Sequence, residues 1–227
     1  MTVELLDTTL REGEQTPNVT MTIEQKLEIA EALDEFGVEF IELGHPVVSP
    51  DVREAIHRLA QLDTNAAKIV HARAHPDDIE AAHGSGAPWV GMFFGTSPLS
   101  LEHKFGVTQD EALRRVRDAV ARAKDHDLSV RFTAEDATRT DRDFLIQVSQ
   151  AAEAAGADRL SFPDTVGTAT PASITDLVED VRNAVDVPIH VHCHNDLGLA
   201  TANTLAGLEA GAQLADVTVN GLGERSG

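Results

Sequence analysis

Short apolar runs alternate with amphipathic stretches along the whole chain. The first run, Val3–Leu6, is typical of a strand, and Thr22 with Gln25 has the spacing of a capping box. Apolar residues then recur at helical spacing until Gly37, which favours a helix end there. The same pattern predicts further strands at Val38–Leu43, Lys68–His71, Trp89–Phe93, Leu128–Phe132, Arg159–Phe162, Val187–Cys193 and Ala215–Val219. It predicts further helices over Pro50–Leu62, Pro76–His83, a segment capped by Thr108, Asp141–Ala155, a segment spanning 174–185, and Ala200–Ala210.

Eight strands and seven intervening helices predict an α/β fold, a closed (β/α)8 barrel, formed by residues 1–227 as a single domain. A repeat of about 30 residues suits one strand–helix unit. A doubly wound open sheet is the alternative, but no glycine-rich dinucleotide loop follows the first strand. No helix is predicted after the last strand, so we expect the ring of helices to lack its eighth member.

Composition narrows the classes of partner. The formal charge of −20 argues against nucleic acid and anionic membranes as partners. It is typical of a solvated acidic exterior, and a high-salt habitat is a second interpretation. Cys193 is the only cysteine, so no internal disulfide is possible, and no apolar run approaches the length of a membrane span. We expect a soluble cytoplasmic protein.

The sharpest chemical signal lies in the seventh predicted strand. Side chains alternate along a strand, so His190, His192 and His194 share one face, and Cys193 points to the helices. His192 and His194 lie nearest the carboxyl end of the strand, where barrel enzymes carry their sites. With a carboxylate such as Glu12 after the first strand, they would form a facial site for one divalent metal. The competing interpretation is a set of hydrogen-bonded histidines in a polar barrel mouth, and we favour it only for the deeper His190.

Two arginines are expected at the same mouth. Arg11 adjoins the proposed ligand Glu12 and could stabilise an oxyanion on a carbonyl, or form a salt bridge across the mouth. Arg131 follows the fifth strand and points inward. An inward arginine without a partner is costly, which favours an anionic ligand.

Six motifs resemble the metal-dependent enzymes that condense acyl-CoA with 2-oxo acids: homocitrate, 2-isopropylmalate and citramalate synthases. They are DTTLREGEQ at 7–15, ELGHPVVSP at 42–50, RFTAED at 131–136, DTVG at 164–167, HCHND at 192–196 and NGLGERSG at 220–227. Hydroxymethylglutaryl-CoA lyase is a more distant member of the group, and an aldol-type cleavage is therefore a further alternative. The motifs occur in order over the whole chain, which makes the set specific.

The resemblance implies an acyltransferase acting on acetyl-CoA and a 2-oxo acid, in amino-acid biosynthesis. The matching positions imply Glu12, His192 and His194 as metal ligands, for Mg, Mn, Co or Zn, and Arg11 and Glu135 as catalytic residues. Arg11, Gln15, His71, Arg131, Thr133 and Thr165 match the residues that bind the acceptor acid.

Three details favour homocitrate synthase, and hence 2-oxoglutarate, within this group. They are the Arg11–Glu12 pair, Arg131 matching the arginine for the distal carboxylate, and His71 in the same pocket. Thr133 departs from the usual serine. The 2-isopropylmalate and citramalate synthases are the alternatives.

The family's chains usually continue past this point into a lid region. We therefore expect a chain that is truncated at its C-terminal end relative to the family. We expect it to act as a homodimer or with a complementary C-terminal chain. The alternative to an enzyme is a metal-binding barrel subunit that has no turnover without such a partner chain.

Overall fold

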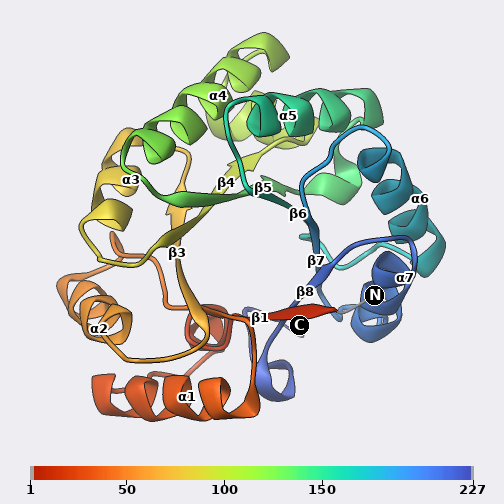
Figure 1. Ribbon diagram of the computed structural model, residues 1–227. Coiled ribbons are helices and arrows are strands. Elements are labelled where there is room, and N and C mark those ends of the chain that lie inside the picture. Colours follow the sequence, from red (N-terminus) through yellow and green to blue (C-terminus); the bar gives the residue numbers. More distant parts are fainter. Residues whose placement is uncertain (1–2, 226–227) are drawn as a thin grey trace.

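The computed structural model describes residues 3–225, and the strands form one closed parallel barrel in the order of the sequence (Figure 1). The predicted fold class is confirmed. The strands are β1 (Glu4–Asp7), β2 (Phe40–Glu42), β3 (Ala67–Arg73), β4 (Trp89–Gly95), β5 (Ser129–Glu135), β6 (Arg159–Asp164), β7 (Ile189–Cys193) and β8 (Leu214–Val217). The helices around them are α1 (Ile23–Phe36), α2 (Pro50–Ala60), α3 (Pro76–His83), α4 (Gln109–Asp125), α5 (Arg142–Ala154), α6 (Pro171–Arg182) and α7 (Ala200–Glu209).

The helices begin where the sequence places capping residues. The Thr22 side chain accepts a hydrogen bond from the backbone N–H of Gln25, and the reciprocal bond of the capping box is present. Thr108 caps α4 in the same way, through the backbone N–H of Glu111. None of the described helices is both long and apolar enough to cross a bilayer.

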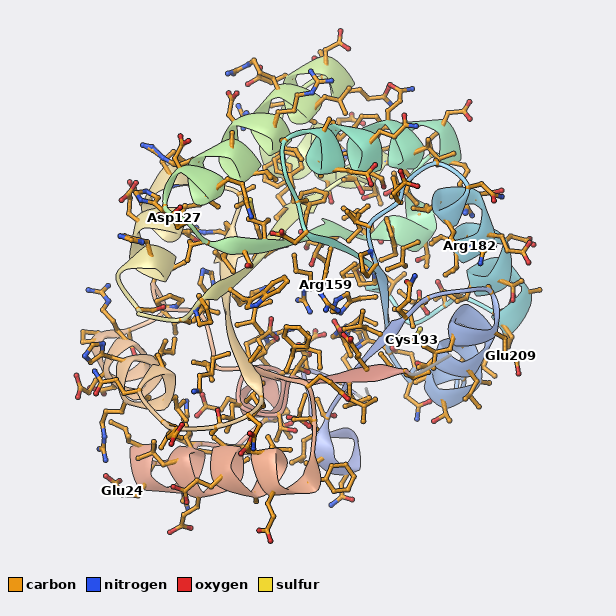
Figure 2. All side chains as sticks on the ribbon, viewed as in Figure 1. Glu24, Asp127, Arg159, Arg182, Cys193 and Glu209 are labelled. Atoms are coloured by element: carbon orange, nitrogen blue, oxygen red, sulfur yellow. The ribbon has the colours of Figure 1, made fainter. Side chains whose placement is uncertain are left out.

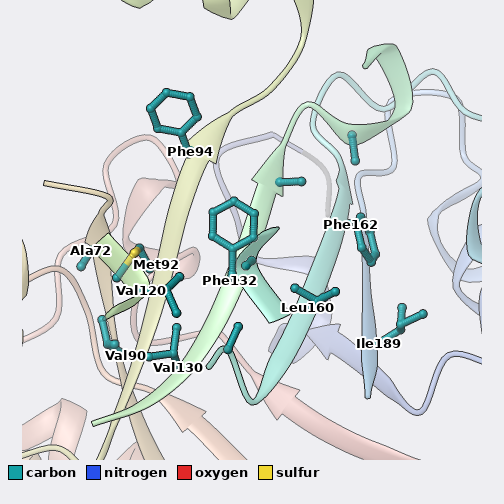
Figure 3. Close-up of a cluster of buried hydrophobic side chains, with 14 of the residues drawn as sticks. Ala72, Val90, Met92, Phe94, Val120, Val130, Phe132, Leu160, Phe162 and Ile189 are labelled. Atoms are coloured by element: carbon teal, nitrogen blue, oxygen red, sulfur yellow. The ribbon is translucent and has the colours of Figure 1, made fainter. Parts of the chain in front are cut away.

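The main core lies between the strands and the surrounding helices. Figure 3 shows Phe132, Phe162 and Leu160 on the outer face of β5 and β6, where they are almost fully buried. Alternate residues of the same strands therefore face into the barrel. Hydrophobic periodicity does not distinguish the two faces, because the barrel buries both.

The barrel interior has an apolar floor, and one pair of charged side chains packs against it. Leu6, Phe40, Ile69 and Leu214 form the floor, and Trp89 packs against Phe40 edge to face at 5.3 Å. Arg159, which lies inside the ring of strands in Figure 2, places its guanidinium 4.7 Å above the Phe40 ring and pairs with Glu4 at 2.7 Å.

The ring of helices is open between α7 and α1. After β8 the described chain continues only as a 3-10 turn, Val219–Gly221, so the expected absence of an eighth helix holds for residues 3–225 (Figure 1). β8 also ends two residues before the predicted Val219. An apolar groove lies at the gap and is lined by Leu5, Ile29, Leu33, Phe36, Val217 and Val219 among others, and Phe36 is 79% exposed.

Candidate active site

The carboxyl ends of the strands surround one polar pocket, and every predicted site residue lines it. These residues are Arg11, Glu12, Gln15, His71, Arg131, Thr133, Glu135, Thr165, His192 and His194. Phe93, Ser161, Pro163, Asp216 and Glu224 complete the lining. The chain thus brings together residues from both its ends, because β1 pairs with β8 to close the barrel. Their individual roles remain predictions.

A group able to hold a cation lies at the rim of the pocket. Glu12, His194 and Glu224 each offer one ligand atom, and these atoms lie within 4.8 Å of one another. Glu12 and His194 are buried, and the Nδ1 atom of His194 has no hydrogen-bond partner. A buried imidazole nitrogen without a partner is costly, so its pairing with a ligand would offset that cost.

His192 stands beside this group rather than inside it. Its ring centroid is 5.1 Å from that of His194, and its Nδ1 lies 3.2 Å from a carboxylate oxygen of Asp216. Glu224, which the sequence did not single out, is the third member of the compact group. The NGLGERSG motif that contains Glu224 extends to residues 226–227, outside the described residues.

Electrostatics favour the forms that bind metal. Burial raises the pKa of the Glu12 carboxyl, but the Arg11 charge and the Glu224 backbone N–H outweigh it, so this pKa lies below its ordinary value. Burial lowers the pKa of His194 to about 4, and the His192 and Arg225 charges act in the same direction. His194 is therefore neutral near pH 7, and the neutral ring is the form that ligates metals.

Beneath the rim, two arginines alternate with two carboxylates. Arg11 donates to Glu42 at 2.6 Å and also to Glu12. Arg131 lies 3.3 Å from Glu42 and 3.0 Å from Asp216. Burial opposes ionisation of both carboxylates, but their pKa values lie below the ordinary range. For Glu42 the Arg11 charge is the main cause, and for Asp216 it is the Arg131 charge with the hydrogen bonds from His190 and His192.

This layer corrects one inference about Arg131. The sequence suggested that an inward arginine needs an external anion, yet Glu42 and Asp216 already neutralise its charge. Only its Nε atom is buried without a partner. The physical reason is that the closed barrel points side chains of β2, β5 and β8, which are not neighbouring strands, into one interior, so residues 85 and 89 positions apart meet there.

Glu135 stands at the opposite side of the pocket. Lys104 donates to both of its carboxylate oxygens, at 3.0 and 2.7 Å. Lys104 belongs to a π-helical turn, Ser100–Phe105, and its ammonium group lies 5.7 Å from the centre of the Phe93 ring. Such turns are rare and often occur at functional sites. A side chain at Gly95 would meet both Ser100 and Glu135, which explains the glycine.

The remaining predicted residues contribute hydroxyl, amide and imidazole groups. The buried hydroxyl of Thr133 has no partner, whereas the Thr165 hydroxyl accepts from the Asp136 backbone N–H at 2.9 Å. Gln15 ends a 3-10 turn at the pocket edge. His71 stacks on Phe93 at 4.7 Å, and its Nδ1 lies 3.1 Å from Glu42.

His71 gives a prediction about pH. Burial and the Arg11 charge lower the pKa of His71 to about 4, although Glu42 acts in the opposite direction. Because the folded pKa lies below the unfolded value of 6.5, the contribution of His71 to stability is present above pH 6.5 and is lost as the pH falls toward 4. The full loss is on the order of 3 kcal/mol.

Urea unfolding of the metal-free protein at pH 7, 5.5 and 4.5 checks this dependence. His71→Asn should show a smaller loss of stability between pH 7 and 4.5 than the wild type, and the exposed His57→Asn should show the same loss as the wild type. Equal pH dependence in all three proteins would contradict the assignment.

Glu42 and Asp216 are functional candidates that the sequence did not single out, although Glu42 is the first residue of the ELGHPVVSP motif. Each is an acidic residue inside an apolar strand, FIE in β2 and LADV in β8. A buried carboxylate in an apolar strand is rare unless it has a buried partner. This feature of the sequence could have identified both residues.

Comparisons with known proteins agree with this geometry. The profile of the family described as HMGL-like matches residues 2–227. A "Probable 2-isopropylmalate synthase" from Methanopyrus kandleri is 50% identical over 225 residues, which cover 99% of this chain and 45% of that protein. A "Homocitrate synthase" from Pyrococcus abyssi is 50% identical over 223 residues, which cover 98% of this chain and 62% of that protein.

The chain spans about half the length of the curated relatives it matches. Among solved structures, the HMG-CoA lyase from Bacillus subtilis superimposes with a TM-score of 0.85 at 23% identity, over 98% of this chain and 78% of the other. That likeness supports the barrel fold alone.

Proposed function

Because the chain belongs to the HMGL-like family, we propose that it forms the catalytic barrel of an enzyme that condenses acetyl-CoA with a 2-oxo acid, most favourably 2-oxoglutarate. One observation carries the proposal. A single pocket combines a rim, where ligand atoms of Glu12, His194 and Glu224 lie close enough to hold a cation and His192 lies beside them, with the buried guanidinium of Arg131 below it. An acceptor with a chelating 2-oxo-carboxylate end and a second carboxylate matches these two features.

The donor set fits a divalent cation such as Mg, Mn, Co or Zn. Glu12, His192 and His194 would hold it, and the unpartnered Nδ1 of His194 is the observation that favours a ligand here. When bound, the cation would polarise the 2-oxo group of the acceptor. Imidazole and carboxylate ligands suit several of these metals, and Glu224 brings a further carboxylate to the same space.

The protein's own residues would bind and orient the two substrates. Arg11 would donate to the oxygen on which negative charge develops, and Glu135 would accept a proton from the acetyl methyl group. The methyl carbon would then bond to the carbonyl carbon of the acceptor, whose oxygen takes the electron pair and then a proton. Water would cleave the thioester and release free CoA with a new carboxylate. Arg131 would donate to the distal carboxylate. Gln15, His71, Thr133 and Thr165 would contact the acceptor acid.

A branched or shorter acceptor, as in 2-isopropylmalate or citramalate synthesis, is the second candidate. The 50% identity to a probable 2-isopropylmalate synthase favours it, as does the internal neutralisation of Arg131 by Glu42 and Asp216. A second chain would act with this barrel, either as a homodimer partner or as a complementary C-terminal chain. The alternative of another class is a metal-binding barrel subunit without turnover of its own.

Calorimetric titration of the Mn²⁺-loaded chain tests the acceptor. We expect 2-oxoglutarate to bind more tightly than 2-oxoisovalerate, pyruvate or oxaloacetate. Arg131→Lys keeps the charge but loses the planar fork, so it should weaken 2-oxoglutarate by about 10-fold and leave pyruvate unchanged.

A preference for 2-oxoisovalerate or pyruvate would contradict 2-oxoglutarate as the acceptor and favour 2-isopropylmalate or citramalate synthesis instead. Failure of all four acids to bind the Mn²⁺-loaded chain would refute the proposed function. Free CoA release, measured with and without a C-terminal partner chain, separates an independent enzyme from a subunit.

A further inference from the structure

The carboxylate of Asp216 on β8 contacts three side chains at the base of the pocket. Its Oδ1 lies 3.0 Å from His190 Nδ1, and its Oδ2 lies 3.2 Å from His192 Nδ1 and 3.0 Å from an Arg131 nitrogen. The side chain is 1% exposed. One carboxylate oxygen is therefore shared by a histidine at the rim and by the arginine at the base of the pocket.

We propose that Asp216 is a positioning residue that fixes both the tautomer of His192 and the orientation of Arg131. The proposal rests on the proposed function, because it assigns His192 to the metal and Arg131 to the distal carboxylate. It goes further, because it makes one buried aspartate responsible for metal affinity and for the choice of acceptor acid.

The hydrogen-bond chemistry carries the first half of the proposal. An ionised carboxylate only accepts, so the Nδ1 atom of His192 must donate to Asp216. The lone pair of the neutral ring then resides on Nε2, the nitrogen left free for a metal. A histidine ligand held by a carboxylate in this way is oriented and made more basic, and loss of the carboxylate typically weakens metal binding by about 10–100-fold.

The geometry of Arg131 carries the second half. Asp216 and Glu42 each contact a different terminal nitrogen of the guanidinium, which fixes the plane of the fork. The side chain is 2% exposed and lines the pocket, so its orientation determines which donors face an acceptor acid. Without Asp216, the guanidinium could rotate, and recognition of a second carboxylate would weaken.

The test compares Asp216→Asn with Asp164→Asn. Asp164 on β6 is also fully buried, but it binds Thr138 and the backbone N–H groups of Thr168 and Ala169. We expect Asp216→Asn to weaken Mn²⁺ binding by about 10–100-fold, measured by calorimetry, and Asp164→Asn to change it less than about threefold. At saturating Mn²⁺, Asp216→Asn should also reduce the preference for 2-oxoglutarate over pyruvate by about 10-fold.

Nitrogen-15 NMR of the wild-type metal-free protein gives an independent readout that does not depend on how well the variant folds. The His192 ring should carry its proton on Nδ1. A proton on Nε2, or unchanged Mn²⁺ affinity and acid preference in a folded Asp216→Asn, would overturn the proposal. A wild-type protein that binds neither Mn²⁺ nor any 2-oxo acid would instead refute the proposed function.

Discussion

Replacing Glu42 with alanine is expected to lower the free energy of unfolding by about 3–5 kcal/mol. Glu42 is fully buried and contacts Arg11, Arg131 and His71. Removing it takes one negative partner from the buried Arg131 and one from the partly buried Arg11. Breaking a buried ion pair from one side is among the most damaging substitutions. Glu42→Gln keeps the volume and one acceptor oxygen, so its loss should be smaller.

Urea unfolding at pH 7 measures the effect, with Glu24→Ala as the control. Glu24 also pairs with an arginine, Arg58, at 3.2 Å, but it projects from the outside of α1 (Figure 2). Exposed pairs of this kind contribute about 0–1 kcal/mol. If Glu42→Ala and Glu24→Ala lose similar stability, water compensates Arg11 and Arg131 in the absence of Glu42, and the stability of the fold does not depend on this carboxylate.

The second large effect concerns the metal. His194→Ala should weaken Mn²⁺ binding on the order of 100-fold, because one of a few strong ligands is lost. The same substitution should leave the metal-free protein as stable as the wild type or slightly more stable, because the Nδ1 atom of His194 is buried without a partner.

Calorimetric titration measures the Mn²⁺ affinity of His194→Ala, and urea unfolding in EDTA measures the stability of its metal-free form. His57→Ala, an exposed histidine on α2, is the control and should change neither. Mn²⁺ affinity within threefold of the wild type would remove His194 from the site. A large loss of stability in EDTA would show instead that His194 is a structural residue.

The strand pattern predicted much of this site because strand side chains alternate. Alternation assigns His192 on β7 and His194, directly after this strand, to one face and Cys193 to the other. The structure confirms the face of Cys193: it is buried against the helices, and burial raises the pKa of its thiol to about 12. His190 lies deep and 1% exposed, as its position along the strand indicated.

The partners of Arg131 could not be predicted in the same way. They depend on the register in which β1 and β8 close the barrel, with Leu6 opposite Asp216. A slip of one residue would turn Asp216 away from the interior, and no local pattern fixes that register. The contact of Glu224 with Glu12 depends on a backbone hydrogen bond across 212 positions of sequence, which is equally non-local.

Closure of the barrel by its first and last strands also has a consequence for folding kinetics. The Thr8 backbone N–H donates to the Val217 carbonyl, so the β1–β8 ladder forms only when these two strands, about 200 residues apart, meet. Contacts of such sequence separation form late and slowly. During synthesis on the ribosome, β1 must wait until β8 has been made. A ligand that bridges Glu12 and His194 would bind only after closure, so it should slow unfolding strongly and accelerate folding little.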